Sequence, residues 1–363
     1  MKKRLLFIIW SFSFGGGAEK ILSTLIRNID KEKYEIDVLE FYHTDIKLEE
    51  IGESITLLPP VIDMTRHSRT YSRMMNVLVY LFPSCIRKKY SSNYDIEIAF
   101  NYLIPTFLLN KKNRCFSWVH TDVTDLKRNK FLRYKQRKSW EFVEKIVSIS
   151  NNTEQSILEI FPEFKNKVYK IYNGYEFEKI LTMGNEQTDI VLKANSLLFI
   201  GRFEERKDPL ACIKLLKYLH NNKHKHHLYY MGFGKLENKI FDLAKDYNLQ
   251  DYVHVIAYQK NPYPIIKQCQ SIILLSICEG FPTVLVEGLA LGKPFISTRV
   301  GGAEELVNNG KCGCIVENGE YEMASDFLKK NFDEVEKVCR QHAQRYSAAE
   351  QYIQFEQMIE SEV

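Results

Sequence analysis

The chain has 363 residues, of which 45% are hydrophobic and 26% charged, and its formal net charge is +4. This length predicts two domains, each with its own core, and the composition excludes a disordered or low-complexity protein. The eight cysteines lack metal-ligand spacing, which indicates reduced thiols in a cytoplasmic protein and no metal site.

The amino-terminal segment MKKRLLFIIWSF has the basic and apolar residues of a signal peptide, but no small-x-small cleavage site follows it. We expect a first β-strand from Leu5 to Trp10, a turn from Ser11 to Gly17, and an amphipathic helix that begins at Ala18. The glycines have neither dinucleotide-binding nor P-loop spacing, so they indicate either close approach of a ligand or a tight turn. No stretch reaches the roughly 20 apolar residues that a membrane span needs.

The next predicted strands of the first half are Tyr34 to Tyr42, Ile55 to Leu58, Tyr94 to Phe100, Arg114 to Val119, Lys145 to Ser150 and Val168 to Tyr172. His120 comes directly after one of them. In a parallel α/β sheet this position lies at the carboxyl edge, where ligands bind. A lone histidine there is either structural or functional.

The first half is the more basic one. Between Lys111 and Lys138, ten Lys or Arg residues face only two acidic residues. The predicted helix from Tyr71 to Phe82 is either a core helix or a helix in a membrane interface. The basic and aromatic stretch from Leu126 to Val143 fits an anionic membrane better than nucleic acid, because no RNA-binding signature accompanies it. A merely solvated face is the alternative.

A second βα series begins after Asn173-Gly174 and a polar passage from Glu176 to Asn195. Its first strand is Leu197 to Ile200, and the loop that follows carries Arg202 and Lys207. These two cations can converge on one diphosphate, with two ordinary surface cations as the alternative.

Two further glycines follow the next predicted strand, Leu228 to Met231. Gly232 and Gly234 let the backbone approach a flat base or a ribose closely. Strands at Tyr252 to Ile256 and Pro294 to Ser297 and a helical tail from Ser347 to Glu362 complete this half.

The most informative stretch begins with the apolar strand Ser271 to Leu275. A turn that carries Glu279 follows it, and Pro282 fits as the first residue of the next helix, which carries Glu287. Two carboxylates in this arrangement can hold a polyhydroxylated ligand at two points.

The first turn of this helix adds an anion site to the two carboxylates. The free amides of Thr283 and Val284 fit an anion between them. A nucleotide sugar has hydroxyls on its sugar and on its ribose, with phosphates between them. This layout matches two carboxylates with an anion site between them, although an ordinary surface helix can also carry two glutamates.

Four motifs give the chain a family resemblance. EGFPTVLVEGLALGKPFISTRVGGAEELV, from Glu279 to Val307, resembles the E-x7-E signature of retaining glycosyltransferases of the family 4 type. LLFIGRFEERKDP, YYMGFG and GGGAEK, which begin at Leu197, Tyr229 and Gly15, resemble the other motifs of this family. Four motifs in the right order are far more specific than any one.

The resemblance implies an α/β protein of the GT-B fold, with two Rossmann-like domains that face one another across a cleft. Residues 1–173 would bind the acceptor, and residues 174–346 would bind the nucleotide-sugar donor. The C-terminal helix, 347–363, would cross back to the first domain.

The resemblance also assigns roles to residues. Glu279 would hold the donor sugar, Glu287 the ribose, and Arg202 and Lys207 the diphosphate, with His120 near the sugar. We expect no cofactor and no metal, since no Asp-x-Asp stands where a divalent ion would be needed. The catalytic residues are predicted to be Glu279, His120, Arg202 and Lys207, and the donor-binding residues Gly16, Gly17, Gly201, Arg202, Lys207, Gly232, Gly234, Glu279, Gly280, Phe281, Thr283, Val284 and Glu287. Pro282 stands where many family members have a second glycine. Because proline has no N–H group, this position cannot donate a hydrogen bond to a sugar or a phosphate.

The implied function is retaining transfer of a hexose or N-acetylhexosamine from a UDP sugar to a lipid-linked saccharide in bacterial surface polysaccharide assembly. The protein would act in the cytoplasm, peripherally on the inner face of the plasma membrane, with the anionic membrane surface as a partner and no nucleic acid. Alternatives are a nucleotide-sugar 2-epimerase of the same fold, a transferase that acts on a glycosylated protein, and a non-catalytic partner subunit. A nicotinamide dehydrogenase is disfavoured because no G-x-G-x-x-G follows either opening strand.

Overall fold

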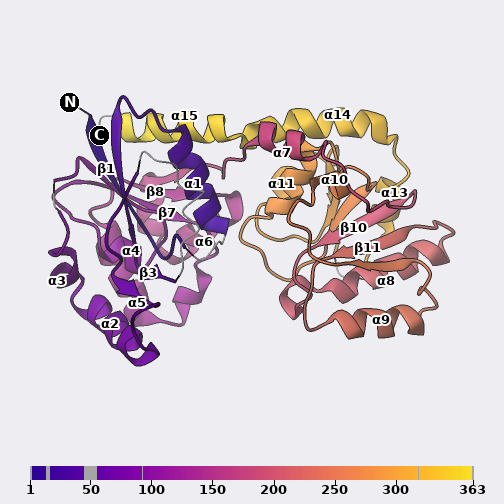
Figure 1. Ribbon diagram of the computed structural model, residues 1–363, viewed down its shortest axis with the longest axis horizontal. Helices are drawn as coiled ribbons and strands as arrows, with labels where there is room; N and C mark the ends of the chain where they lie inside the picture. The colour runs from indigo at the N-terminus through magenta and orange to yellow at the C-terminus, as the bar shows by residue number, and fades with distance from the viewer. Residues whose placement is uncertain (1, 14–16, 45–54, 92, 318, 362–363) are drawn as a thin grey trace. The chain divides into compact units, whose positions relative to one another are not determined.

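The computed structural model describes residues 2–13, 17–44, 55–91, 93–317 and 319–361, which form two compact units (Figure 1). Unit 1 comprises Met1–Tyr175 together with Ala348–Val363, and unit 2 comprises Glu176–Ser347. The boundaries predicted from the sequence lie after residues 173 and 346.

Unit 1 is built on a seven-stranded parallel sheet of order β4-β2-β1-β6-β7-β8-β9. Its strands are β1 (Lys3–Ile9), β2 (Tyr34–Glu40), β4 (Thr56–Leu57), β6 (Ile96–Ala99), β7 (Arg114–Val119), β8 (Lys145–Ser148) and β9 (Val168–Lys170), and β3 (Tyr42–His43) pairs with β5 (Ile62–Asp63) in a small separate sheet. The predicted strand from Tyr34 to Tyr42 is therefore two strands in two sheets.

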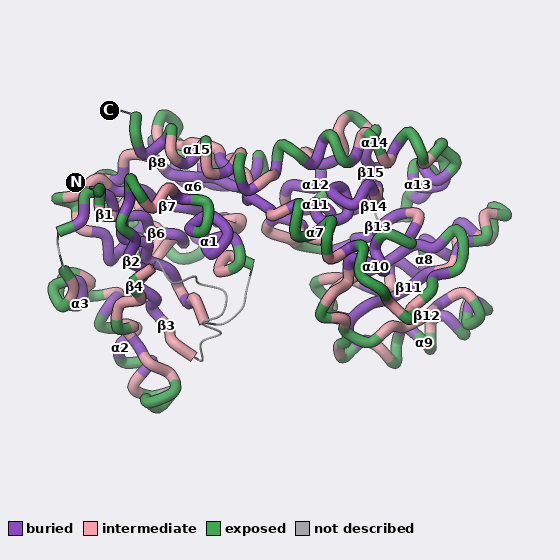
Figure 2. The backbone as a smooth tube through the Cα atoms, turned by 45° about the horizontal axis from the view of Figure 1, so that its top comes forward, coloured by how far each residue is buried: buried purple, intermediate pink, exposed green. Residues whose placement is uncertain are grey.

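The helices of unit 1 follow the βα order that the sequence predicts. They are α1 (Gly17–Asn28), α2 (Arg69–Leu81), α3 (Pro83–Arg87), α4 (Ile104–Phe107), α5 (Lys130–Trp140), α6 (Asn151–Ile160) and α15 (Ala348–Glu360), with 3-10 turns η2 (Thr124–Lys127) and η3 (Pro162–Lys167). Near-continuous apolar strands such as β1 are buried on both faces, as expected for a parallel sheet covered by helices on both sides. Figure 2 shows this contrast between buried strands and exposed outer helices.

Unit 2 contains a six-stranded parallel sheet of order β12-β11-β10-β13-β14-β15. Its strands are β10 (Ser196–Ile200), β11 (His227–Met231), β12 (Val253–Ile256), β13 (Ser271–Leu274), β14 (Phe295–Ser297) and β15 (Gly313–Ile315). Its helices are α7 (Phe177–Met183), α8 (Pro209–Asn221), α9 (Glu237–Asp246), α10 (Tyr263–Ile266), α11 (Thr283–Ala290), α12 (Ala303–Leu306), α13 (Glu322–Phe327) and α14 (Phe332–Ala343), with 3-10 turns η4 (Glu205–Lys207) and η5 (Gln344–Tyr346).

The polar passage expected between Glu176 and Asn195 contains a helix, α7, which the sequence analysis did not predict. Its apolar residues Phe177 and Ile180 are one turn apart and buried. Seven residues are too few to produce a clear helical period, so burial rather than pattern defines this helix.

The C-terminal helix α15 belongs to unit 1 and lies beside α1 (Figure 1). Its Phe355 is fully buried, and the Phe355 ring centroid lies 6.0 Å from that of Phe7 in β1. At the helix surface, Lys33 Nζ lies 2.8 Å from Glu356 Oε1. The last helix therefore returns to the first half of the chain, as predicted.

Candidate active site

The predicted donor-binding residues of unit 2 gather at the carboxyl edge of its sheet, where β10 and β13 are neighbours. From β10 the chain continues through β11 and β12 on one side, and it then crosses to β13, β14 and β15 on the other. In an open α/β sheet this reversal of strand order lets the two adjacent loops diverge and leaves a crevice for a ligand. The loops concerned are residues 201–208 after β10 and residues 275–282 after β13.

An ion pair joins these two loops at the reversal point. Lys207 Nζ lies 2.6 Å from Glu279 Oε1, and the same oxygen accepts a 2.7 Å hydrogen bond from Ser276 Oγ. The side chains are 28% and 10% exposed, respectively, so Glu279 is largely sheltered while the ammonium still reaches solvent. The predicted cation and the predicted acid therefore lie in contact, 72 residues apart in the sequence.

The backbone before α8 fixes the position of Lys207. η4 ends at Lys207, and Asp208 takes a left-handed conformation with φ of 39°. The Asp208 side chain then caps α8 by accepting a bond from the Ala211 amide, and Pro209 occupies the first turn. The lysine is thus held on a sharp turn directly before a capped helix.

Arg202 is placed differently from Lys207. Its guanidinium lies 3.1 Å from Glu204 of the same loop, and its side chain is 67% exposed. The structure pairs the two predicted diphosphate-binding cations with two different carboxylates.

A third cation, Arg206, ties the loops together and was not among the predicted site residues. Its carbonyl accepts a 3.0 Å bond from the Ile277 amide, and its Nε donates to the Cys278 carbonyl at 3.4 Å. The family motif contains Lys207 as its cation, so Arg206 was not singled out. Sequence spacing carries no signal for a main-chain hydrogen bond between loops so far apart.

Glu287 lies on α11 and is 8% exposed. Its Oε1 accepts a 3.0 Å hydrogen bond from the Tyr263 hydroxyl of α10. Burial and, next, the charge of Glu287 raise the pKa of Tyr263, so this hydroxyl remains a donor at neutral pH. No sequence motif marked Tyr263, because it stands on a four-residue helix 24 positions before its partner.

Glycines let the loops of this edge approach one another closely. A Cβ at Gly232, after β11, would lie 2.1 Å from the Gly201 carbonyl oxygen, and a Cβ at Gly301, after β14, would lie 2.4 Å from that of Gly280. Distances this short exclude a side chain at either position, so two pairs of neighbouring loops pack backbone to backbone. Gly234 also follows β11, as predicted from the sequence.

The N-terminus of α11 differs from the prediction. The helix begins at Thr283, one residue after Pro282, and the Thr283 amide is not free because it donates to the Phe281 carbonyl at 2.9 Å. Pro282, with φ of −79° and ψ of 84°, lies at the centre of this three-residue turn. The expectation of a free Thr283 amide is therefore wrong. Val284 remains in the first turn of the helix, and the Phe281 ring is buried against Gly302.

The remaining predicted site residues belong to unit 1. Gly17 opens α1 and is exposed, and Gly16 lies outside the described residues. His120 follows β7, where its ring centroid lies 4.6 Å from that of Phe100. Burial lowers the pKa of His120 to about 3, although a bond to the Phe100 backbone opposes this effect. Its Nε2 is buried and has no hydrogen-bond partner among the described residues. The imidazole is therefore neutral at physiological pH.

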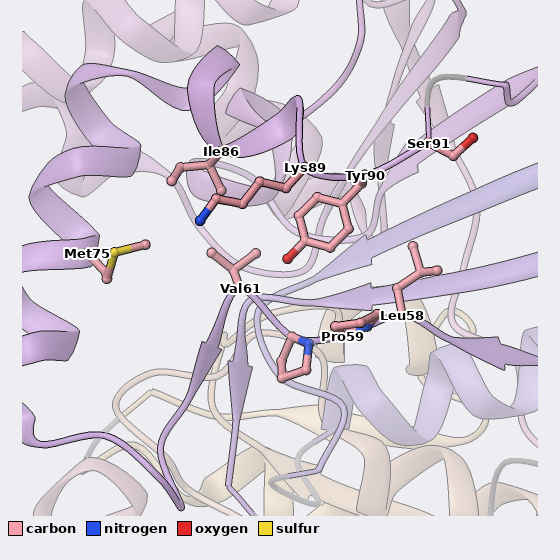
Figure 3. A pocket seen from close by; sticks show the side chains of 9 residues that line it. Leu58, Pro59, Val61, Met75, Ile86, Lys89, Tyr90 and Ser91 are labelled. Carbon is pink, nitrogen blue, oxygen red and sulfur yellow. The ribbon is translucent and has the colours of Figure 1, made fainter.

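One hollow in unit 1 is lined by other residues (Figure 3). It has a volume of about 370 Å³, and Met75, Ile86, Lys89 and Tyr90 are among its lining residues. None of the predicted site residues lines it. Within the described parts of the chain, no helix combines the length and apolar character that a bilayer crossing requires.

Comparisons with known proteins bear on the fold and on the class of activity. Residues 185–346 match the family model for glycosyl transferases group 1. The chain is 25% identical to an uncharacterised glycosyltransferase of Methanocaldococcus jannaschii over 296 residues, which are 76% of this chain and 71% of the relative. It is 24% identical over 325 residues, 86% of this chain and 84% of the relative, to the GalNAc-alpha-(1->4)-GalNAc-alpha-(1->3)-diNAcBac-PP-undecaprenol alpha-1,4-N-acetyl-D-galactosaminyltransferase of Campylobacter jejuni.

A solved structure is also similar over the whole chain. The crystal structure of HepE from Anabaena in complex with UDP has a TM-score of 0.75, with 99% of each chain covered and 15% sequence identity. At this identity the likeness shows the fold alone. The fold is GT-B, as predicted, and the sequence matches support a glycosyltransferase.

Proposed function

We propose that this protein is a retaining glycosyltransferase that moves a hexose or N-acetylhexosamine from a UDP sugar to a lipid-linked saccharide in bacterial surface polysaccharide assembly. The observation that carries the proposal is the contact between Lys207 and Glu279 at the reversal point of the unit 2 sheet. It brings a cation suited to a diphosphate and an acid suited to sugar hydroxyls into one place.

Lys207 is proposed to stabilise the leaving diphosphate. An ammonium group has three N–H donors, and the contact with Glu279 uses one of them, so Lys207 can donate to a phosphate oxygen while it keeps its partner. Departure of the diphosphate develops negative charge, which a fixed cation stabilises more in the transition state than in the ground state. The exposed Arg202 guanidinium would add a bidentate contact after it leaves Glu204, because an exposed ion pair of this kind contributes little energy.

Glu279 is proposed to hold the donor sugar near its anomeric carbon. Both of its described hydrogen bonds fall on Oε1, so Oε2 is available to accept bonds from sugar hydroxyls. Lys207 and Ser276 hold the carboxylate in place, and this role is positional and electrostatic rather than nucleophilic. With retention, a donor phosphate oxygen would take the acceptor proton on the face from which the diphosphate departs.

Glu287 is proposed to bind the ribose hydroxyls of the nucleotide. Tyr263 fixes one of its oxygens, and Gly201, Gly232, Gly234 and the turn from Gly280 to Val284 supply backbone around the nucleotide. Gly16 and Gly17 are proposed to contribute from the first βα turn of the chain, and the neutral His120 is proposed to lie near the donor sugar.

The reaction is proposed to need neither cofactor nor metal, since Lys207 and Arg202 supply the positive charge at the leaving group. Transfer by the purified protein should therefore continue at an unchanged rate in EDTA. Loss of activity in EDTA and its return with Mg²⁺ or Mn²⁺ would contradict this part of the proposal.

The acceptor assignment rests on relatives. The Campylobacter jejuni relative has a name that specifies an undecaprenol diphosphate-linked saccharide acceptor, and it covers most of this chain. By analogy, we propose a lipid-linked saccharide acceptor bound by unit 1, and peripheral action at the cytoplasmic face of the membrane.

Incubation of the protein with UDP sugars, with and without lipid-linked saccharides, tests the proposal. We expect acceptor-dependent release of UDP and a product whose anomeric configuration, read by proton NMR coupling, matches that of the donor. Conversion of UDP-N-acetylglucosamine to its 2-epimer without acceptor would instead identify an epimerase. A product with inverted configuration would contradict the retaining mechanism.

A further inference from the structure

Helix α2 exposes apolar side chains on the side that faces away from the core of unit 1. Met75 and Val79 are buried in that core. On the rest of the helix and at its C-cap, five large apolar residues are between 36% and 57% exposed: Met74, Val77, Leu78, Leu81 and Phe82. The helix is therefore apolar on both sides, and one side has no covering element among the described residues.

A second helix extends this apolar surface. Val77, Tyr80 and Leu81 of α2 line a hollow of about 340 Å³ together with Asn129, Phe131 and Leu132 at the start of α5. Phe131 is 49% exposed, and Tyr134, one turn further along α5, is 57% exposed. We name the set Met74, Val77, Leu78, Leu81, Phe82 and Phe131 the α2–α5 patch.

The two segments that carry the α2–α5 patch are rich in basic residues and contain no acidic residue. Residues 64–94 and 126–140 carry thirteen Lys or Arg and no Asp or Glu, whereas the other residues of the chain include 37 Lys or Arg against 46 Asp or Glu. The charge of these two segments thus has the opposite sign to that of the rest of the protein.

Several of these cations point to solvent without an acidic partner. Arg73, Lys88, Lys89, Arg128 and Lys130 are exposed, and none of them has an ion pair within 4.0 Å in the parts of the chain that the structure describes. Arg73 lies one turn before Val77 on the same stripe of α2, and Lys130 directly precedes Phe131. Lys89 lies beside the hollow between α2 and α3 (Figure 3).

We propose that the α2–α5 patch is a docking surface for an anionic lipid bilayer. Exposed apolar side chains insert at the boundary between headgroups and acyl chains, while the surrounding Lys and Arg contact acidic headgroups. A contact between two copies of this chain is disfavoured here, because the exposed Lys and Arg residues beside both patches would repel each other. The inference deepens the proposed function, since a lipid-linked acceptor lies in the same membrane, but membrane binding itself needs neither donor nor acceptor.

Sedimentation of the full chain with vesicles tests the docking surface. We use vesicles of phosphatidylglycerol and phosphatidylcholine, vesicles of phosphatidylcholine alone, and no vesicles. The wild-type protein should bind the anionic vesicles, and this binding should fall as the ionic strength rises from about 0.05 to about 0.5 M.

Two triple variants with the same kind of substitution distinguish vesicle binding by the patch from binding by exposed apolar residues in general. Val77→Ser, Leu81→Ser and Phe131→Ser together remove patch residues that are about half exposed, and Phe241→Ser, Met323→Ser and Ile353→Ser together remove equally exposed apolar residues elsewhere. The patch variant should lose vesicle partitioning by about tenfold or more, because less apolar surface leaves water on binding. The control variant should partition like the wild type.

A second pair of variants tests the charge. Arg73→Gln, Arg128→Gln and Lys130→Gln together should weaken binding to anionic vesicles, whereas Lys214→Gln, Lys239→Gln and Lys245→Gln together make the same net change of charge and should not. Circular dichroism establishes that each variant is folded.

Clear outcomes overturn the docking surface. The docking surface is excluded if the folded patch variant partitions to vesicles as strongly as the wild type. It is also excluded if the patch variant and the apolar control variant lose vesicle binding equally. If the wild type self-associates and the patch variant does not, the surface is a protein interface instead. A protein that transfers no sugar but binds vesicles through the patch refutes the proposed function and leaves this inference intact.

Discussion

The contact between Lys207 and Glu279 places opposite charges at the reversal point of the unit 2 sheet, where we propose that a sugar diphosphate binds. The pair is only partly buried, and ion pairs near a surface add little to stability. Its position at the reversal of strand order, rather than its energy, makes the pair significant.

Replacing either member of this pair should reduce transfer far more than it reduces stability. We expect Lys207→Ala and Glu279→Ala each to lower kcat/KM for the donor by about a hundredfold or more, the usual effect of removing a preorganised charged contact. Turnover with the donor and the melting temperature are the two measurements.

A neighbouring ion pair is the matched control for this prediction. Lys235 Nζ lies 2.8 Å from Glu205 Oε2, and both side chains are more than 60% exposed. Lys235→Ala should leave turnover nearly unchanged. Near-normal turnover in Lys207→Ala with Arg202→Ala would show that the leaving-group assignment is wrong.

His120 should make unit 1 less stable in acid. The pKa of the folded His120 is about 3, below the usual 6.5, so the unfolded chain takes up a proton that the folded chain does not. The stability contribution is complete above pH 6.5 and is lost as the pH falls from there towards 3, by about 1 kcal/mol between pH 6 and pH 5.

Urea unfolding of the wild type and His120→Asn between pH 7 and pH 4.5 measures this effect. All three tryptophans, Trp10, Trp118 and Trp140, belong to unit 1, so their fluorescence reports on the unit that contains His120. The difference in unfolding free energy between the two proteins should shrink as the pH falls. A constant difference would mean that His120 is not buried as a neutral ring.

Sequence reasoning identified both ends of the Lys207–Glu279 contact but not the contact itself. The motifs placed each loop directly after a strand of a parallel sheet, at its ligand-binding edge. Ion pairing, however, depends on side-chain directions that no spacing specifies. The same limit applies to Ser276 and Tyr263, whose bonds to Glu279 and Glu287 depend on the packing of loops and short helices.

At the scale of elements, the loops after β13 and β14 pack closely against each other because glycines leave no side chain between them. Gly301 has φ of 49° and would bring a Cβ within 2.4 Å of the Gly280 oxygen. Gly280 follows Glu279 directly, so any displacement of this loop moves the proposed sugar-binding carboxylate.

Gly301→Ala should therefore weaken donor binding as well as stability. We expect a loss of about 1–2 kcal/mol from the left-handed backbone, together with a raised KM for the donor because the loop of Glu279 shifts. Gly310→Ala is the control, since Gly310 has φ of 76° and a Cβ there would meet no atom within 4 Å. The control should show the stability loss alone, and an equal KM change in both variants would contradict the packing explanation.

The type and order of most elements could be predicted, because apolar strands and capped amphipathic helices leave clear periods in the sequence. Two features could not. α7 is too short to show a helical period, and the turn at Pro282 uses the Thr283 amide that helix rules alone leave free. In both cases tertiary packing or a local turn decided the outcome.

At the scale of the whole molecule, α15 lies far from unit 1 in sequence but forms part of its core. Phe355 is fully buried, and Met358 and Ile359 are at most 2% exposed. The last helix is therefore a structural part of the first half of the chain.

Phe355→Ala should destabilise unit 1 by about 3–5 kcal/mol, because it removes a buried aromatic ring and leaves a cavity. Tryptophan fluorescence during urea unfolding should show an unfolding midpoint at a lower urea concentration, since every tryptophan belongs to this unit. The exposed neighbour Ile353→Ala should change the midpoint little. Similar midpoints for the two variants would mean that α15 does not contribute to this core.

Calorimetric titration of nucleoside diphosphates into the wild type and Lys207→Ala tests the central claim, a diphosphate site at the reversal point of the unit 2 sheet, most directly. We predict that UDP binds the wild type and the control Lys235→Ala equally. Its affinity for Lys207→Ala should be lower by at least about tenfold, because one charge-assisted hydrogen bond is lost. Equal affinity of UDP for all three proteins, or no binding of any nucleoside diphosphate to the wild type, would contradict the account.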